Sequence, residues 1–359
     1  MEARPVDADV LIAGGGPGGG AAAIACAMRG LRVILCERER FTKERPGETL
    51  HPGIEPLLAQ LGVSDRLAGV VGARHPGIWI EWGGPRRFEA FGGDSDGPWN
   101  GFQAWRADFD ALLLERALEL GVEIRQPCAI GGLRKQDDAR SVIETSQGPV
   151  AARMLIDATG RTRWLGRALG IASPARSLPL YARYGYAEGA CPARDEAPAL
   201  AADKSGWTWT AMVRPNLYQW TRLAFDGTQP GAEWLPEEFR GLKPRGASRG
   251  ADVTWRLANE TAGPGWFIVG DAAALLDPAS SHGVLRAIMS GMMAAHLSEA
   301  VLSGKAPAAE ASAMYCRWLA DWFEADSTAL ARFYNELGAS IRAPAQASAA
   351  SVERSAPAA

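Results

Sequence analysis

The stretch Gly14-Gly15-Gly16-Pro17-Gly18-Gly19 decides the fold of this chain. Gly14, Gly16 and Gly19 satisfy the Gly-x-Gly-x-x-Gly pattern, between an apolar segment (9–13) and a small-residue segment (21–29). The first glycine permits a tight turn, the second lets the backbone approach a pyrophosphate, and the third lets a helix pack close to a strand. The N–H groups at the start of that helix then face the phosphates. The sequence therefore predicts a strand, a turn and a helix that bind a dinucleotide.

A carboxylate after the next apolar segment narrows the choice of dinucleotide. Glu37 follows residues 31–36, and a carboxylate at this position accepts hydrogen bonds from ribose hydroxyls. The same carboxylate disfavours a 2′-phosphate, so the site suits the ADP half of FAD or NAD and not NADP. A glycine-rich turn of an unrelated α/β protein is the alternative interpretation, and the segments around the turn argue against it.

Composition excludes several classes of protein. The 359 residues are 47% hydrophobic and 22% charged, which is enough for a large buried core. A net charge of -3 excludes a general affinity for nucleic acid or acidic membranes. The five cysteines form no CxxC pair, so we expect neither disulfides nor a metal site, and a reducing, cytoplasmic location. No signal core opens the chain and no run reaches membrane-spanning length.

Periodicity divides the chain into two interleaved parts. We expect an α/β fold whose Rossmann-like nucleotide-binding domain is discontinuous and consists of residues 7–75, 102–172 and 257–305. Period-two runs predict an antiparallel β-sheet substrate domain from residues 76–101 and 173–256. Helices are expected over 306–340, and the Ala/Ser/Pro-rich residues 341–359 are predicted to be disordered.

Residues 266–273, Trp-Phe-Ile-Val-Gly-Asp-Ala-Ala, form the second diagnostic stretch. A strand ends there, Gly270 allows a close approach, and Asp271 can accept a ribitol hydroxyl. The stretch resembles the strand–Gly–Asp motif of flavoprotein hydroxylases of the para-hydroxybenzoate hydroxylase-like fold, in which the aspartate binds FAD. The alternative is that Asp271 only caps a helix. Together with the glycine turn, the resemblance implies that the cofactor is FAD.

Other segments are similar to the same flavoprotein class. Residues 276–284, which include Pro278, resemble the segment beside the isoalloxazine ring. The N–H groups of Gly283 and Val284 and the positive end of a helix would there stabilise the reduced flavin. The resemblance implies three further contacts with FAD, from Arg45, Arg106 and Gly160.

The source of electrons is left open by the sequence. The Asp-Gly pair that hydroxylases associate with NADPH use is replaced in residues 155–160, and no second glycine fingerprint follows a strand. We therefore expect an external reductant, either NAD(P)H that docks transiently or a partner flavin reductase.

The resemblance is closest to the branch that includes flavin-dependent tryptophan halogenases, and it covers most of residues 8–300. Residues 205–212, Ser-Gly-Trp-Thr-Trp-Thr-Ala-Met, are similar to the halogenase Gly-Trp-x-Trp-x-Ile-Pro motif without its Ile-Pro. The halogenase Lys-x-Gly-Ile segment matches His75-Pro76-Gly77-Ile78, so a histidine replaces the lysine that handles hypohalous acid. Because imidazole suits acid–base work near pH 7, we expect hydroxylation and keep halogenation as the alternative.

A narrower resemblance concerns the substrate. Residues 276–292 and 216–223 are similar to the flavoprotein monooxygenases of tryptophylquinone cofactor biogenesis, which hydroxylate a tryptophan within a partner protein. The resemblance implies hydroxylation of an indole or tryptophan, in a partner protein, through the flavin C4a-hydroperoxide that hydroxylating members share. Trp79, Trp82 and Trp220 are expected to be exposed to such a partner; an aromatic pocket and the core of the sheet are the alternatives for these residues. An FAD-dependent reductase of the isoprenoid-saturating type and a non-catalytic FAD carrier are further alternatives. The expected proton-handling residues are His282, His75, His51 and Glu48.

Overall fold

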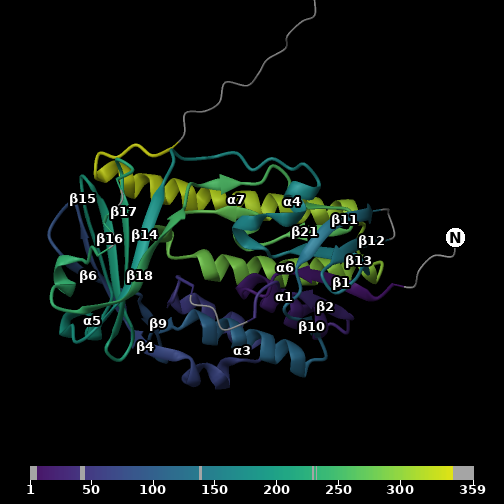
Figure 1. The fold of residues 1–359 in the computed structure, drawn as a ribbon, viewed down its shortest axis with the longest axis horizontal. Coiled ribbons are helices and arrows are strands. Elements are labelled where there is room, and N and C mark those ends of the chain that lie inside the picture. Colours follow the sequence, from purple (N-terminus) through teal and green to yellow (C-terminus); the bar gives the residue numbers. More distant parts are fainter. Residues whose placement is uncertain (1–5, 41–44, 137–139, 229, 232, 343–359) are drawn as a thin grey trace, which may run out of the picture.

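The computed structural model describes residues 6–40, 45–136, 140–228, 230–231 and 233–342. It has two halves side by side, a mixed sheet with its helices on the right of Figure 1 and an upright, mostly antiparallel sheet on the left. The 29-residue helix α7 (Ala308–Glu336) runs along both halves. The expected α/β fold class is confirmed.

The sheet of the first half has the strand order β10-β2-β1-β13-β12-β11, and β21 joins it beside β13. The pairs of β1 with β2, β1 with β13 and β13 with β21 are parallel. The bounds are β1 (Ala8–Ala13), β2 (Val33–Cys36), β10 (Glu123–Arg125), β11 (Ile130–Gln136), β12 (Ser141–Thr145), β13 (Val150–Asp157), β20 (Ala262–Gly263) and β21 (Trp266–Ile268).

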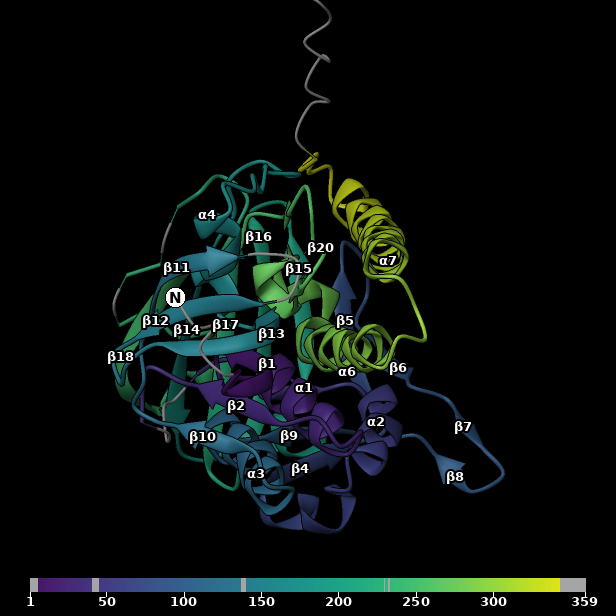
Figure 2. The same cartoon turned by 90° about the vertical axis from the view of Figure 1, so that its right-hand side faces the viewer.

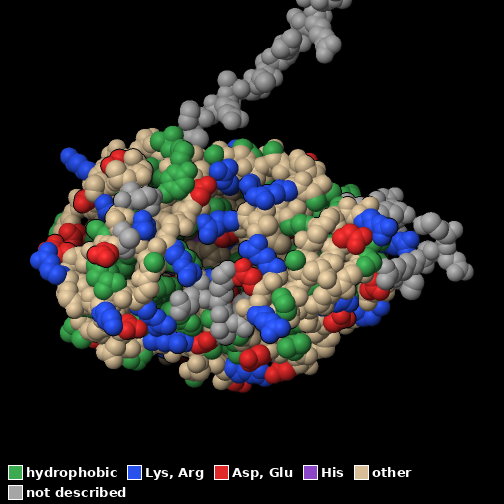
Figure 3. Space-filling view, viewed as in Figure 1, with side chains coloured by type: hydrophobic (Ala, Val, Ile, Leu, Met, Phe, Trp, Pro, Cys, Tyr) green, Lys and Arg blue, Asp and Glu red, His purple; other side chains and the backbone are tan. Residues whose placement is uncertain are grey.

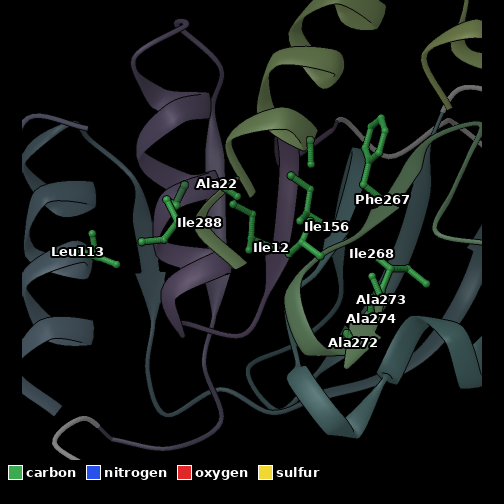
Figure 4. Packing of buried hydrophobic residues seen from close by; sticks show 14 of the residues in the cluster. Ile12, Ala22, Leu113, Ile156, Phe267, Ile268, Ala272, Ala273, Ala274 and Ile288 are labelled. Atoms are coloured by element: carbon green, nitrogen blue, oxygen red, sulfur yellow. The ribbon is translucent and has the colours of Figure 1, made fainter. Parts of the chain in front are cut away.

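Helices α1 (Pro17–Ala27), α3 (Arg106–Glu119) and α6 (Gly283–Leu302) pack on this sheet, and small residues let them approach closely. A β-carbon on Gly291 of α6 would lie 2.2 Å from the carbonyl oxygen of Gly18, so only glycine fits where α6 crosses α1. Figure 4 shows Ile288 of α6 against Ala22 of α1, with Ile12 and Ile156 of the sheet behind them. This packing places the start of α1 against Ala287 and Gly291 of α6.

The second half is a seven-stranded sheet in the order β18-β14-β17-β16-β15-β5-β6. Its pairs are antiparallel except for β15 with β5. The bounds are β5 (Gly77–Trp82), β6 (Arg87–Ala90), β14 (Tyr181–Glu188), β15 (Ala199–Asp203), β16 (Gly206–Arg214), β17 (Leu217–Ala224) and β18 (Lys243–Asp252).

Short elements connect the two halves. The sheet β3-β9-β4 lies between them, and the β7–β8 hairpin projects from the body at the lower right of Figure 2. The bounds are β3 (Thr49–Leu50), β4 (Val71–His75), β7 (Gly93–Asp94), β8 (Gly97–Pro98), β9 (Gly101–Ala104), β19 (Arg256–Leu257), β22 (Ala274–Leu275), α2 (Glu55–Gln60), α4 (Trp164–Ala168) and α5 (Pro192–Glu196). Among the described residues no helix is both long and apolar enough to cross a membrane. The domain boundaries given above stay predictions.

Two expectations about particular residues are wrong. Trp82 and Trp220 are buried, because Trp82 packs on α7 and Trp220 packs beside Trp234 on the side of the sheet away from the first half. They therefore offer no exposed surface to a partner protein. Ile341, expected in a disordered tail, is buried, and Arg342 pairs with Ser177; residues 343–359 lie outside the described residues.

Candidate functional site

A cavity of about 730 Å³ lies between the two halves, and both contribute to its wall. The glycine turn, the start of α6 and the residues that follow β13 and β21 line one side, and strands β14 to β18 line the other. Figure 3 shows a hollow on this face of the molecule with Lys and Arg side chains around it. The size and the position fit a dinucleotide together with a small substrate.

The glycine turn has the geometry that pyrophosphate binding requires. Gly14 has φ +100°, and a β-carbon on Gly19 would lie 1.9 Å from the carbonyl oxygen of Gly14. A β-carbon on Gly16 would meet no atom within 4 Å, because Gly16 faces the open cavity, as do Pro17 and Gly18. Helix α1 begins there with no side-chain cap and no acidic residue in its first turn. Its N–H groups are therefore free for an anion.

Glu37 directly follows β2, and its carboxylate holds the glycine turn in addition to facing the cavity. Its carboxylate accepts hydrogen bonds from the N–H of Gly15 at 2.8 Å and of Glu39 at 3.0 Å, and the side chain is buried. One carboxylate oxygen thus braces the glycine turn, while the remaining lone pairs can still accept a ribose hydroxyl. Arg45 lines the same part of the cavity and pairs with Glu39.

The position of Asp271 tests whether the cavity can hold the ribitol chain of FAD. Gly270 has φ +58° and donates its N–H to Ser290, which turns the chain so that Asp271 reaches the cavity wall. Burial raises the pKa of the Asp271 carboxyl, against the opposing effect of Arg161 and Arg106. Within the described part of the chain this carboxylate accepts no hydrogen bond. It is therefore available to a ribitol hydroxyl, and the residues present fit FAD.

Arg106 lines the cavity but is already engaged within the protein. Its guanidinium forms two hydrogen bonds of 3.0 Å with Asp110 and one of 3.1 Å with the carbonyl oxygen of Pro46. Arg106 thereby holds the segment 46–48 against the start of α3. Its expected contact with FAD stays a prediction.

The segment before α6 forms part of the cavity wall. Pro278, Gly283 and Val284 line the cavity, and α6 begins at Gly283 with no side-chain cap and no acidic residue in its first turn. The positive end of α6 therefore faces the cavity. Gly160, with φ +60°, lines the wall beside it after β13.

Glu48 is the one of the four expected proton-handling residues that lines the cavity. It is 3% exposed, Tyr186 donates its hydroxyl to Oε1, and the N–H of Gly47 donates to Oε2 at 2.9 Å. Burial raises the pKa of the Glu48 carboxyl to about 7, although the hydrogen bond from Tyr186 lowers it. A carboxyl that titrates near pH 7 at a cavity wall suits proton transfer.

The three histidines lie together outside the described cavity wall. The His51 ring is 5.6 Å from the His282 ring, and Phe91 is 5.6 Å from both His51 and His75. Burial lowers the pKa of His75 to about 4, and its two ring nitrogens contact Gly77 and Gln103. His75 is therefore neutral at pH 7 and does not replace the charge of a lysine. The catalytic roles of the histidines stay predictions.

The substrate-side wall is built by alternation along strands. Every second residue points into the cavity, as expected for a sheet with one face on the site. Arg249 of β18 pairs with Tyr184 of β14, and Ala251 with Ala182. The cavity-facing residues are Ala182, Tyr184, Leu200, Trp207, Trp209, Gln219, Thr221, Arg249 and Ala251. The sequence identified the two tryptophans, but only the strand register reveals Tyr184, Gln219 and Arg249.

The comparisons with known proteins agree with this geometry. Residues 7–181 match the family model of an FAD binding domain. The chain is 26% identical to the tryptophan 2-halogenase of Chondromyces crocatus, over 92% of this chain and 68% of that protein. It is 27% identical to a brominase of 1H-pyrrole-2-carbonyl peptidyl-carrier protein from Pseudoalteromonas luteoviolacea, over 82% of this chain and 78% of that protein. Residues 7–181 are thus similar to an FAD-binding domain, and the chain as a whole is similar to halogenases.

Solved structures share the fold of this flavoenzyme. The flavin-dependent halogenase CmlS superposes with a TM-score of 0.84 at 22% identity, over 94% of this chain and 66% of CmlS. Aklavinone-11 hydroxylase, solved with FAD and aklavinone, superposes with a TM-score of 0.72 at 20% identity, over 85% of this chain and 64% of the hydroxylase.

The cofactor and the enzyme class follow from these matches. The protein is an FAD-dependent enzyme of the oxidoreductase type, as the sequence predicted. The relatives named here are halogenases, so they support the halogenase alternative better than the hydroxylase expectation. None of these names supports the narrower resemblance to tryptophylquinone biogenesis.

Proposed function

We propose that this flavoenzyme replaces a hydrogen on an electron-rich aromatic ring, such as an indole, with a halogen or an oxygen atom. The observation that carries the proposal is the two-sided cavity, with FAD-binding groups on one side and Trp207, Trp209 and Tyr184 on the other. Aromatic side chains favour an aromatic ligand held in a stacked or edge-on geometry.

Halogenation is the first candidate outcome, because it is the activity named for the relatives. Hydroxylation is the second, and one observation favours it. No lysine is among the described residues of the cavity wall, and His75, which replaces the expected lysine, is neutral and buried. The described wall therefore offers no ammonium group to hold a hypohalite.

Bound FAD would supply two electrons for the reduction of O₂, and the chain's own residues control the protons. Glu48 accepts the proton that leaves the substituted ring carbon, since its carboxyl lines the cavity and burial raises its pKa to about 7. Tyr186 holds Oε1 in place, and Arg106 holds the preceding backbone at Pro46. The start of α6 faces the cavity and would stabilise negative charge on a reduced flavin bound there.

Arg249 indicates which charge the substrate carries. Its guanidinium faces the cavity from β18, and within the described residues it has no acidic partner. We propose that the substrate carries an anionic group, such as a carboxylate, which Arg249 binds. A free aromatic acid fits this arrangement, whereas a tryptophan within a partner polypeptide lacks that carboxylate.

The test combines the protein, FAD, a flavin reductase with NADH, and free indole carboxylates, with bromide, chloride or ¹⁸O₂. A product with the bromine isotope pattern supports halogenation, and incorporation of ¹⁸O supports hydroxylation. Consumption of NADH with neither product, across free aromatic acids and tryptophan-containing peptides, would overturn the proposal. Modification of peptides alone would overturn the anionic-substrate part.

A further inference from the structure

Helix α7 is joined to both sides of the cavity through one hydroxyl group. Tyr334, in the last turn of α7, is fully buried. Its hydroxyl donates to Asp277 Oδ1 at 2.9 Å and accepts the Nε1–H of Trp207 at 2.7 Å. Asp277 belongs to the segment that precedes α6, and Trp207 belongs to β16 of the substrate-side sheet. Both residues are among those that line the cavity, and they come from different halves of the molecule.

Asp277 is held by more than Tyr334. The indole Nε1–H of Trp255 donates to Oδ2 at 2.6 Å, and the N–H of Ala279 donates to Oδ1 at 3.0 Å. Burial raises the pKa of the Asp277 carboxyl to about 6, and these hydrogen bonds oppose the rise. A buried carboxylate with several donors has one well-defined position, so the segment 277–280 is fixed relative to its donors.

We propose that Tyr334 is a positioning residue that sets the distance and orientation between the FAD side and the substrate side of the cavity. It acts through Asp277 on one side and Trp207 on the other. The two sides belong to separate sheets, and Tyr334 joins them by one chain of three groups, Trp207, Tyr334 and Asp277. Reaction between a reduced cofactor and an aromatic ring depends strongly on such alignment.

The first experiment needs neither FAD nor substrate. Hydrogen–deuterium exchange of the FAD-free protein compares Tyr334→Phe with the unchanged chain. Tyr334→Phe removes both hydrogen bonds of the hydroxyl, and loss of the one to Asp277 should raise amide exchange in residues 276–284 by roughly tenfold. Equal exchange in this segment would overturn the proposal.

Trp82→Phe is the matched control. Trp82 donates its Nε1–H to the carbonyl oxygen of Phe333 at 2.7 Å, so it anchors the same end of α7 to the same sheet. It forms no hydrogen bond with Asp277 or Trp207 in the described structure. Trp82→Phe should raise exchange near the end of α7 and leave residues 276–284 unchanged. A rise there as large as that of Tyr334→Phe would mean that α7 acts by general packing, and the proposal fails.

The second experiment rests on the proposed function and measures coupling, the fraction of consumed NADH that yields product. Tyr334→Phe should retain FAD, since the glycine turn and Asp271 are unchanged, but lose coupling about fivefold or more because misalignment is costly. Trp207→Phe removes a hydrogen bond that Tyr334→Phe also removes, so the double variant should be no worse than the poorer single variant. If the losses of coupling in the two single variants add up in the double variant, the two residues do not act through the same hydrogen-bonded chain. If no variant makes product but exchange changes as stated, the proposed function fails and the positioning role survives.

Discussion

The two sides of the cavity are built in different ways. On the FAD side, contiguous segments such as residues 14–19 and 270–271 present backbone groups and glycines at fixed positions. On the substrate side, side chains from strands distant in sequence meet by alternation, for example Arg249 opposite Tyr184. The FAD side is expected to bind the cofactor, which does not differ between enzymes of this fold. The substrate side can change one residue at a time without disturbing the backbone, so it is where substrate choice resides.

The largest effect is expected for substitutions on the FAD side, which should weaken FAD binding. Gly16→Val combined with Asp271→Ala should lower FAD affinity by about 10²-fold or more, because a side chain blocks the pyrophosphate and a hydrogen bond to a charged group is lost. The melting temperature of the FAD-free protein should barely change, since a β-carbon at Gly16 meets no atom within 4 Å. Flavin absorbance after gel filtration measures the retained FAD. Normal FAD content would contradict the cofactor site.

Gly19→Ala is the matched variant in the same turn. Its β-carbon would lie 1.9 Å from the carbonyl oxygen of Gly14, so this change should destabilise the protein itself by about 1–3 kcal/mol. Thermal unfolding of the FAD-free form would separate this effect from that of Gly16→Val.

Glu48→Gln tests the proton-accepting role of Glu48, which binds Tyr186 of the substrate-side sheet. Product formation should fall by about 10²-fold, the scale of general acid–base catalysis. In the unchanged protein, activity should rise with pH through about 7, because burial raises the Glu48 pKa to about 7 and only the carboxylate accepts a proton. Glu48→Gln should remove this rise. A pH profile that keeps the rise would assign it to another group.

His282→Ala is compared directly with Glu48→Gln. His282 lies 3.6 Å from Asp326 and outside the described cavity wall, so its loss should lower turnover by less than about tenfold. A loss of turnover as large as that of Glu48→Gln would show that His282 is as important for proton transfer as Glu48.

On the substrate side, the effect is expected in KM and not in kcat. Arg249→Gln should raise KM for an anionic aromatic substrate by about tenfold and leave kcat within about twofold, since it removes binding away from the reacting carbon. Arg183→Gln is the control, because Arg183 is on neighbouring β14 but bonds Ser248 on the opposite face. Equal changes in both variants would indicate a general charge effect.

The difference between the two sides also explains what the sequence could predict. The glycine turn, Glu37 and Gly270-Asp271 are read from short contiguous patterns, because one local backbone conformation determines their role. Tyr186 and Tyr334 carried no local signal. Each is defined by a partner 138 or 57 residues away, Glu48 and Asp277, and only the pairing of distant elements brings them together. The sequence could not decide whether Trp220 lies in the pocket, at the surface or in the core, because period two does not say which face of a sheet points to the site.

The strand order of the first sheet has a consequence for how the protein reaches its native state. β1 pairs with β13, and β13 with β21, which follows in the chain only after the whole substrate-side sheet. During synthesis, residues 181–252 must therefore fold beside a nucleotide sheet that still lacks β21. Such non-local pairing slows folding and leaves the edge of β13 open for association with other chains. Expression at lower temperature, or with chaperones that shield strand edges, should therefore raise the yield of this enzyme more than it does for folds with local strand pairing.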